Sequence, residues 1–539
     1  MQIMKKLVSL FLALALILSL STVAFAANDV NVIMPTGDTA RTYDAYQLLK
    51  LTTSLKTDEH HTAHEGGHTD DCYNYAYTVN EKYRAVLQEE TFNNAGASVW
   101  GATGKPANVQ GVTDEQILEH LSHQSSDSGN TYGSLRAVAD RLYHTISTMD
   151  PDADDITETA NIAQGYWMFA DVSVLSGEEN ATSLVMVDTK GMSDITITPK
   201  VSIPTIEKKV KDIEDSEDDK ILDNPWLDSA DHDIGDTVPF KLTADAPSNA
   251  QFYDTYTLIF HDTLSDGLTL KEDTIKVLMY DTKYKADVDT DLNDGADVTG
   301  YFTETTTGLT DGCTFEVSCE DVKQIPGMKL TSAFVVYYEA ELNENAVIGA
   351  VGNPNEVYLE FSNNPYGTGT GKTEEDKVVV FTYQMIVNKT DSHNHALAGA
   401  GFTLYKKNLA GEYIALGNEL KGDNMTTFTW KGLDDGDYKL VETTVPQGYN
   451  KMGDIAFSIS ATHSEETDEP VLISLDGGLM GAGDVTNGTI TKDIVNSTGT
   501  VLPETGARGT FMLISISTMF VMVATVFMVT RKKMSIYED

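Results

Sequence analysis

From Lys200 onward the chain consists of short apolar or alternating runs separated by turn signals, and this pattern constrains its fold most strongly. Residues 333–337 and 357–361 are two such runs, and helical periodicity nearly vanishes around them. Because neighbouring side chains of a strand point to opposite faces, such runs predict strands with one buried side. Many short strands in succession are typical of β-sandwiches. We therefore expect one β-sandwich in residues 200–384 and a second in residues 385–497.

The preceding region, residues 27–199, combines two kinds of pattern. Residues 113–116, Thr-Asp-Glu-Gln, form a capping box that predicts the start of a helix, and apolar residues recur at helical spacing within 135–146. The runs 165–169 and 183–187 are typical of strands instead. The chain as a whole is therefore predicted to be mainly β, with tandem immunoglobulin-like β-sandwiches preceded by an α+β N-terminal domain.

Both ends of the chain carry apolar segments that predict export and anchoring. Residues 1–26 have a charged start, an apolar stretch and a small-residue cleavage site, which together predict a signal peptide. Residues 511–530 are almost purely apolar and long enough to cross a bilayer, and the basic tail 531–539 is expected to remain in the cytoplasm. These features predict a secreted protein with a membrane-anchored precursor.

A pentapeptide precedes the apolar span and consists of Leu502, Pro503, Glu504, Thr505 and Gly506. The order of pentapeptide, apolar span and basic tail resembles the cell-wall sorting signal of Gram-positive surface proteins. The resemblance implies that a sortase cuts between the Thr and the Gly and passes the Thr acyl group to an amine. Pilin-type and housekeeping sortases and peptidoglycan are then the expected partners, and the cell wall is the expected location. The alternative is a single-pass anchored protein with an accidental pentapeptide.

Residues 397–405 and 438–449 resemble the collagen-adhesin B-type repeat. The second segment is similar to the E-box of that family, whose Glu catalyses an isopeptide bond between a Lys on the first strand and an Asn on the last. The resemblance implies that Lys389 and Asn496 form the cross-link and that Glu442 is the catalytic acid.

The alternation of the sequence agrees with this assignment, because Lys389, Glu442 and Asn496 are each in phase with apolar neighbours. At such positions an unpaired charge is costly, so burial should lower the pKa of the Lys and raise the pKa of the Glu. We expect the protonated carboxyl to hydrogen-bond the Asn carbonyl and to shuttle a proton as the neutral amine attacks and ammonia leaves.

Four segments of the middle region carry a second resemblance: residues 204–210, 234–238, 261–268 and 353–365. They resemble the pilin-type isopeptide domain of fimbrial backbone subunits, in which the acid is commonly an Asp. The phase of the strands selects Lys208, Asp262 and Asn355 as the corresponding residues. Asn363 is also in phase, so the Asn partner is either Asn355 or Asn363.

Residues 195–200, Ile-Thr-Ile-Thr-Pro-Lys, look like the pilin motif, whose Lys accepts the sortase-held Thr of the next subunit. The resemblance implies that Lys200 is the acceptor, so that Thr505 of one subunit joins Lys200 of another in a covalent homopolymer. The usual tryptophan and tyrosine of the motif are not in their places. A solvated linker lysine is the alternative.

Composition and motifs exclude several other functions. The chain has 82 acidic and 37 basic residues, a net charge of -45, which argues against nucleic acid as a partner. It has no Gly-x-Ser-x-Gly elbow, no His-Glu-x-x-His and no phosphate cradle, so we expect neither an enzyme nor a cofactor. The chain has three cysteines, too few for a disulfide framework, and Cys313 and Cys319 could pair only if the chain turned between them.

Two clusters contain residue types that bind metals. The four histidines between His60 and Cys72 match no familiar spacing, and the acidic stretch 287–297 lacks the Gly and Glu of a calcium loop. We interpret both as solvated loops and assign no metal site from the sequence.

These features together predict the major backbone subunit of a sortase-polymerised pilus, with self-formed Lys-Asn bonds, serving adhesion. The alternative is a monomeric cell-wall-anchored adhesin or an accessory pilin. A host ligand is a further possible partner that the sequence does not identify.

Overall fold

The structure is a computed structural model that describes residues 29–35, 41–55, 73–126, 133–173, 181–198, 202–213, 226–367 and 369–499, with residues 519, 521, 523 and 525. The predicted signal peptide, Lys200, the His60 to Cys72 cluster, the sorting pentapeptide and the basic tail lie outside the described residues, as does most of the predicted span 511–530. No helix within the described ranges is long and apolar enough to cross a membrane.

The first region contains eight described strands in two sheets, ordered β3-β2-β6-β7, with β4 beside β2, and β5-β1-β8. The strands are β1 (Val30–Ile33), β2 (Tyr43–Leu55), β3 (Tyr73–Val79), β4 (Ala153–Ile156), β5 (Thr159–Ile162), β6 (Gly165–Asp171), β7 (Leu184–Asp188) and β8 (Asp194–Thr196). The helices are α2 (Arg84–Asn94), α3 (Asp114–Ser122) and α4 (Ser134–Ile146), with short 3-10 turns at Ala97–Thr103 and Val109–Gly111.

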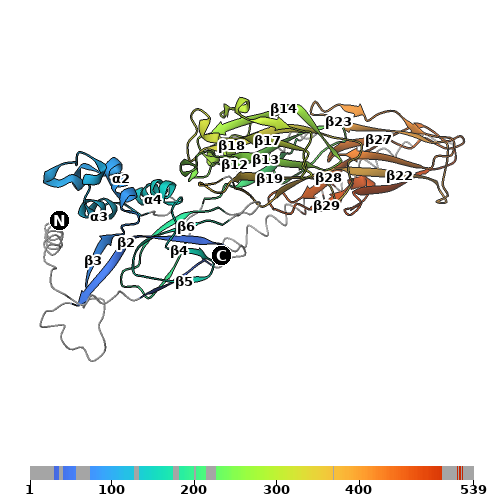
Figure 1. Cartoon of the computed structure of the whole chain (residues 1–539). Helices are drawn as coiled ribbons and strands as arrows, with labels where there is room; N and C mark the ends of the chain where they lie inside the picture. The colour runs from blue at the N-terminus through green and yellow to red at the C-terminus, as the bar shows by residue number, and fades with distance from the viewer. Residues whose placement is uncertain are drawn as a thin grey trace, which may run out of the picture.

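The larger sheet of this region is buried on both faces. Tyr46 and Leu48 of β2 belong to the core beneath the helices, whereas Tyr43 and Ala45 belong to the core shared with the smaller sheet. The predicted capping box is present at the start of α3, where the Thr113 hydroxyl accepts from the Gln116 backbone N–H. The expectation of an α+β region is therefore confirmed (Figure 1).

The middle region is a sandwich of two sheets, ordered β10-β9-β12-β18-β14-β15 and β11-β21-β19-β13-β17-β16, with β20 beside β19. The strands are β9 (Ile206–Lys211), β10 (Trp226–Leu227), β11 (Ser229–Asp231), β12 (Thr237–Asp245), β13 (Leu258–Leu264), β14 (Leu268–Tyr280), β15 (Ala296–Asp297), β16 (Thr303–Thr305), β17 (Phe315–Cys319), β18 (Ala333–Leu342), β19 (Asn353–Ser362), β20 (Thr370–Lys372) and β21 (Asp376–Phe381). The helix α5 (Lys283–Val288) and 3-10 turns at Ala250–Phe252, Thr299–Tyr301 and Val322–Gln324 complete it.

Alternation along the strands builds this core. Phe240 and Leu242 of β12, in one sheet, and Phe260 and Leu359, in the other, are fully buried in a single cluster. The acidic stretch 287–297 begins in α5 and ends in β15, and between them residues 289–295 form a turn in which the Asp289 carboxylate accepts from a tyrosine hydroxyl and from backbone N–H groups.

The last region is a second sandwich, ordered β26-β22-β31-β30 and β24-β23-β27-β28-β29, with β25 beside β23. The strands are β22 (Tyr383–Asp391), β23 (Gly401–Lys407), β24 (Tyr413–Ala415), β25 (Leu420–Lys421), β26 (Thr427–Leu433), β27 (Gly436–Thr444), β28 (Ile455–His463), β29 (Leu472–Asp476), β30 (Gly483–Asp484) and β31 (Thr489–Asn496), with a 3-10 turn at Gly478–Met480. The first and last strands, β22 and β31, pair in parallel.

The two sandwiches lie end to end, and β21 leads into β22 after one residue (Figure 1). Lys406 pairs with Asp233 across their boundary, and the Ile234 N–H donates to the Gly432 carbonyl. The expected fold, mainly β with helices near the N-terminus, is therefore confirmed. Cys313 and Cys319 are both free, because Cys319 lies on β17 and the strand does not turn between them.

Candidate functional site

Strand pairing in the middle sandwich brings the three predicted residues together. Lys208 lies on β9 in one sheet, whereas Asp262 and Asn355 lie on the paired strands β13 and β19 of the facing sheet. All three side chains are fully buried. Each one alternates with apolar neighbours, so the strand period that builds the core also directs these polar groups into it.

The Lys208 amine contacts both of its predicted partners. Its Nζ lies 2.6 Å from Oδ2 of Asp262 and 2.5 Å from Oδ1 of Asn355, and it also donates to the Glu356 carbonyl at 3.2 Å. The nucleophile, the acid and the amide to be attacked therefore form one contiguous cluster. Proximity of this kind supplies much of the rate of an intramolecular reaction.

Burial shifts both ionisable groups toward their neutral forms. It lowers the pKa of Lys208, although Asp262 opposes the shift, and it raises the pKa of Asp262, although Lys208 opposes the shift. A neutral amine is a nucleophile, and a neutral carboxyl can donate a proton. The two directions match those that amide formation requires.

Tyr338 is a fourth member of this cluster that the sequence did not identify. Its hydroxyl lies 3.0 Å from both carboxyl oxygens of Asp262, and Nδ2 of Asn355 donates to it at 2.7 Å. The hydroxyl therefore bridges the acid and the amide nitrogen that would leave. Tyr338 occupies a buried position of β18, in phase with Phe334 and Val336, and this phase was the available signal.

The two Asn candidates lie at different places. Asn355 contacts Lys208, whereas Asn363 follows the end of β19, where its backbone carbonyl accepts from the Thr182 N–H of the first region at 2.8 Å. Eight residues of extended chain separate the two Asn residues by about 26 Å. The structure therefore brings Asn355, and not Asn363, to the lysine.

In the last sandwich, Lys389 and Asn496 lie on the paired parallel strands β22 and β31, and Glu442 lies on β27 of the facing sheet. All three are buried. Lys389 is the register partner of Ile494, two residues before Asn496 on the same face. The cross-link partners therefore belong to one sheet, and the acid reaches them from the other sheet.

The contacts within this second cluster differ from those in the first. Nδ2 of Asn496 donates to Oε1 of Glu442 at 2.6 Å, and the Met452 N–H donates to Oε2 at 2.9 Å. Lys389 donates instead to the carbonyls of Thr390 and Ile494, at 2.9 and 3.0 Å. Burial lowers the pKa of Lys389, and Glu442 opposes this shift.

The Asn496 amide presents its nitrogen to Glu442, whereas we expected its carbonyl there. Its Oδ1 atom is buried and has no hydrogen-bond partner among the described residues. A half-turn of the amide would offer that oxygen to the carboxyl. The sequence reasoning identified the residues of this cluster but not the orientation of the amide.

The first region contains buried charges of another kind. Glu90 accepts from Arg141 at 2.7 Å and lies 3.2 Å from His120, and Arg41 pairs with Asp171. No lysine within the described part of this region is buried. It therefore shows no cluster of the Lys, acid and Asn type among those residues.

Residues 383–469 match the family model of the SpaA prealbumin-like fold domain. The match begins at the first strand of the last sandwich and includes Lys389 and Glu442, but it ends before Asn496. It thus covers two of the three residues of the second cluster.

Over 270 residues the chain is 26% identical to the trypsin-resistant surface T6 protein of Streptococcus pyogenes serotype M6, a match covering 47% of this chain and 44% of that relative. The match thus spans less than half the length of that relative. Among solved structures, the chain is similar to the T6 backbone pilin of the same serotype, with a TM-score of 0.48, 15% identity, and coverage of 89% of this chain and 100% of that one. The major pilin SpaD of Corynebacterium diphtheriae gives a TM-score of 0.40, 15% identity, and coverage of 88% and 98%.

Proposed function

We propose that this chain is the backbone subunit of a sortase-polymerised pilus and that its two sandwiches each close a Lys-Asn amide without help. The observation that carries the amide proposal is the contact of the buried Lys208 amine with both Asp262 and Asn355. The similarity to a streptococcal surface protein supports a location on the cell surface.

In the proposed reaction the neutral Lys208 amine attacks Cγ of Asn355. The new C–N bond replaces the bond to the amide nitrogen, which leaves as ammonia after gaining a proton. Asp262 begins protonated, and Tyr338 lies where it can pass that proton to the departing nitrogen. The amine proton returns to Asp262, so the acid is regenerated and the reaction needs no oxidant or co-reactant.

In the last sandwich the corresponding amide would join Lys389 to Asn496, with Glu442 as the acid. The amine must first leave the Thr390 and Ile494 carbonyls and approach the Asn carbon. Glu442 already contacts the amide nitrogen that would leave as ammonia.

The two amides would carry tension differently. In the last sandwich the bond would join β22 to β31, the first and last strands, so force would bypass the hydrogen-bonded ladder between them. In the middle sandwich Asn355 lies on β19, and β20 and β21 follow it. In the middle sandwich the proposed bond would therefore leave the final strand β21 held by hydrogen bonds alone.

The mass of the intact purified protein tests the amides. Each bond should make the chain about 17 Da lighter than its sequence mass, through loss of ammonia, and two bonds should make it about 34 Da lighter. A mass equal to that of the unmodified chain would refute the amide proposal and leave the surface location untouched.

Polymerisation is tested separately through Lys200, the proposed acceptor for Thr505. Lys200→Ala should abolish the ladder of high-molecular-weight species in cell-wall extracts, and Lys190→Ala, a change of an exposed lysine nearby, should preserve it. Unchanged banding in the first variant would favour a monomeric anchored adhesin.

A further inference from the structure

His261 lies beside the proposed acid Asp262 on β13 but on the opposite face of the strand. Its register partners are Glu316 on β17 and Tyr358 on β19. The imidazole is only 6% exposed, although it lies on the outer face of its sheet. The proposed amide formation does not involve this buried imidazole.

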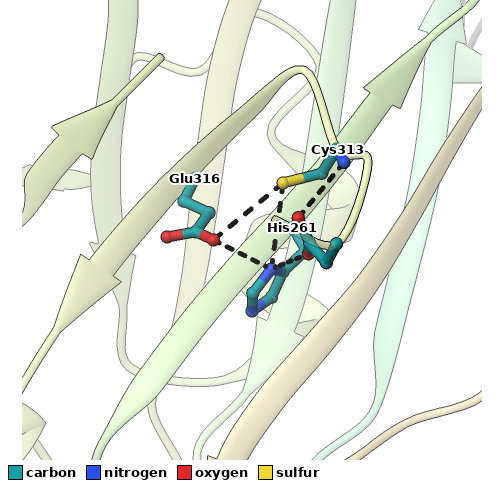
Figure 2. Close-up of side chains that lie close together, drawn as sticks. His261, Cys313 and Glu316 are labelled. Carbon is teal, nitrogen blue, oxygen red and sulfur yellow. Dashed lines mark hydrogen bonds and ion pairs between the residues drawn. The ribbon is translucent and has the colours of Figure 1, made fainter. Parts of the chain in front are cut away.

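Four potential ligand atoms converge at this imidazole, and Figure 2 shows three of the side chains pointing toward one another. Nδ1 of His261 lies 2.8 Å from Oδ2 of Asp311, 3.4 Å from Oε1 of Glu316 and 4.0 Å from Sγ of Cys313. Sγ of Cys313 also lies 4.0 Å from Oε1 of Glu316, and all four atoms lie within 4.8 Å of one another.

These separations fit tetrahedral coordination. Zn²⁺ bonds of about 2.0–2.3 Å to N, O and S place neighbouring ligand atoms about 3.3–3.8 Å apart. The observed separations, from 2.8 Å to at most 4.8 Å, bracket this range, so shifts of up to about 1 Å would close the site. Ligands that include an imidazole and a thiolate favour Zn²⁺ over Ca²⁺ or Mg²⁺, which prefer oxygen atoms alone.

Groups around the cluster orient the imidazole. Oε2 of Glu360 lies 3.3 Å from Nε2 of His261, the nitrogen that faces away from the cluster. A metal at Nδ1 would displace the proton that Nδ1 shares with the Asp311 carboxylate, and Glu360 would then stabilise the imidazole proton at Nε2. Tyr358 stacks on the imidazole at 4.4 Å, and its hydroxyl donates to Asp311 at 2.7 Å.

The charges also favour a cation. Three carboxylates, Asp311, Glu316 and Glu360, and one thiol surround a single imidazole. Lys372 lies over the Tyr358 ring at 4.9 Å and opposite Glu360 on β20. Even with a protonated imidazole the cluster keeps an excess of negative charge, which a divalent ion would neutralise.

We propose that His261, Asp311, Cys313 and Glu316 form a binding site for a zinc-like divalent cation. The ion would link the loop that carries Asp311 and Cys313 to β13. The same strand presents Asp262 to the opposite face of the sheet. Burial, with the nearby Asp311 carboxylate, raises the pKa of the Cys313 thiol to about 12, so binding at neutral pH would release the thiol proton.

Zinc uptake by the purified full-length protein tests this site after treatment with a chelator. The background variant should lack the His60 to Cys72 cluster, so that this cluster cannot contribute to Zn²⁺ binding. Its changes are His60→Gln, His61→Gln, His64→Gln, His68→Gln and Cys72→Ser. Elemental analysis should find one Zn²⁺ per chain of this variant. Adding Cys313→Ser or Glu316→Gln should weaken Zn²⁺ binding in titration calorimetry by at least about tenfold.

Matched controls separate the loss of a metal ligand from a general loss of folded structure. Glu320→Gln changes an exposed neighbour and should leave Zn²⁺ affinity unchanged. With Co²⁺ as the probe, the thiolate charge-transfer band should persist in Cys319→Ser and disappear in Cys313→Ser. Failure of the background variant to bind Zn²⁺, or equal binding by Cys313→Ser, would overturn the proposal and leave His261 as the protonated centre of an ion-pair cluster.

Discussion

The two sandwiches contain the same three kinds of residue but arrange them differently. In the middle sandwich Lys208 contacts both the acid and the amide, and its partners lie across the core in the facing sheet. In the last sandwich the acid contacts the amide, while Lys389 contacts only backbone carbonyls of its own sheet. The amide would therefore join two sheets in one case and two strands of one sheet in the other.

This difference shows which parts of such a cluster can vary. Either the lysine or the acid can come from the sheet opposite the Asn, because both arrangements bury all three side chains in the core. Burial lowers the lysine pKa in each. What differs is how far the amine must move before it can attack, and the following variants test that contrast.

Loss of the acid in the middle sandwich should have the largest effect. Asp262→Ala removes the proton donor and leaves the Lys208 amine buried without its carboxyl partner. The mass deficit should fall from about 34 to about 17 Da, because one ammonia is retained. Removing one partner of a buried pair should also destabilise the sandwich by about 3–5 kcal/mol, measured by denaturant unfolding.

The control for this variant is Asp266→Ala, which changes an exposed Asp four residues away and should leave the mass deficit at about 34 Da and the stability unchanged. Asp262→Asn keeps the shape of the side chain and separates lost chemistry from lost packing. A full mass deficit in Asp262→Asn would contradict the role of the acid.

Loss of the acid in the last sandwich should remove one amide at a smaller cost. Glu442→Gln should halve the mass deficit, as in the middle sandwich, because the proton donor is lost. Lys389 keeps its two carbonyl partners, so the added destabilisation should be only about 1–3 kcal/mol, the cost of a disturbed buried hydrogen bond. Mass spectrometry and denaturant unfolding measure the two effects, and Glu412→Gln, at an exposed position, is the control.

The strand period explains why the residues of both clusters were predictable. A polar residue that alternates with buried apolar ones points into the core, so the burial of Lys208, Lys389 and Glu442 could be predicted from the sequence, whereas their roles were inferred from the family resemblance. Tyr338 was not predicted as a member of the cluster, because a tyrosine at a core position is common in β-sandwiches. The carbonyl contacts of Lys389 and the orientation of the Asn496 amide were not predicted either, because they depend on how the two sheets face one another, and a single sequence leaves strand order open.

The His261 cluster illustrates the same limit. Cys313 and Glu316 are close in sequence, but they meet His261 only because β17 pairs with β13 in one register. A shift of one residue would send the Glu316 side chain to the other face of the sheet. The acidic stretch 287–297, by contrast, could be interpreted locally, since its carboxylates bond to their own turn.

Replacement of Tyr338 tests the proposed transfer of a proton from Asp262 to the Asn355 nitrogen in the middle sandwich. Tyr338→Phe removes the hydroxyl between Asp262 and Asn355 and keeps the ring. The final mass deficit, relative to the variant's own sequence mass, should still be about 34 Da, but amide formation during refolding of unreacted protein should slow by about a hundredfold. Time-resolved mass spectrometry measures this rate, and Tyr256→Phe, at another buried tyrosine of the same sandwich, should leave it unchanged. A purely structural role would instead lower stability without changing the rate.

The smallest effect is expected at Asn363, the alternative Asn partner of the middle sandwich. Its replacement tests the assignment of Asn355 as the partner of Lys208. Asn363→Ala should leave the mass deficit at about 34 Da, because the residue lies away from Lys208. Its contact with Thr182 uses the backbone carbonyl, which alanine retains, so the loss of stability should stay below about 1 kcal/mol. Asn355→Ala is the matched variant and should halve the deficit, since no amide carbon then faces the amine. If the two variants exchanged these outcomes, the lysine would have to reach the far end of the strand, and the buried contacts around Lys208 would be those of an unreactive ion pair.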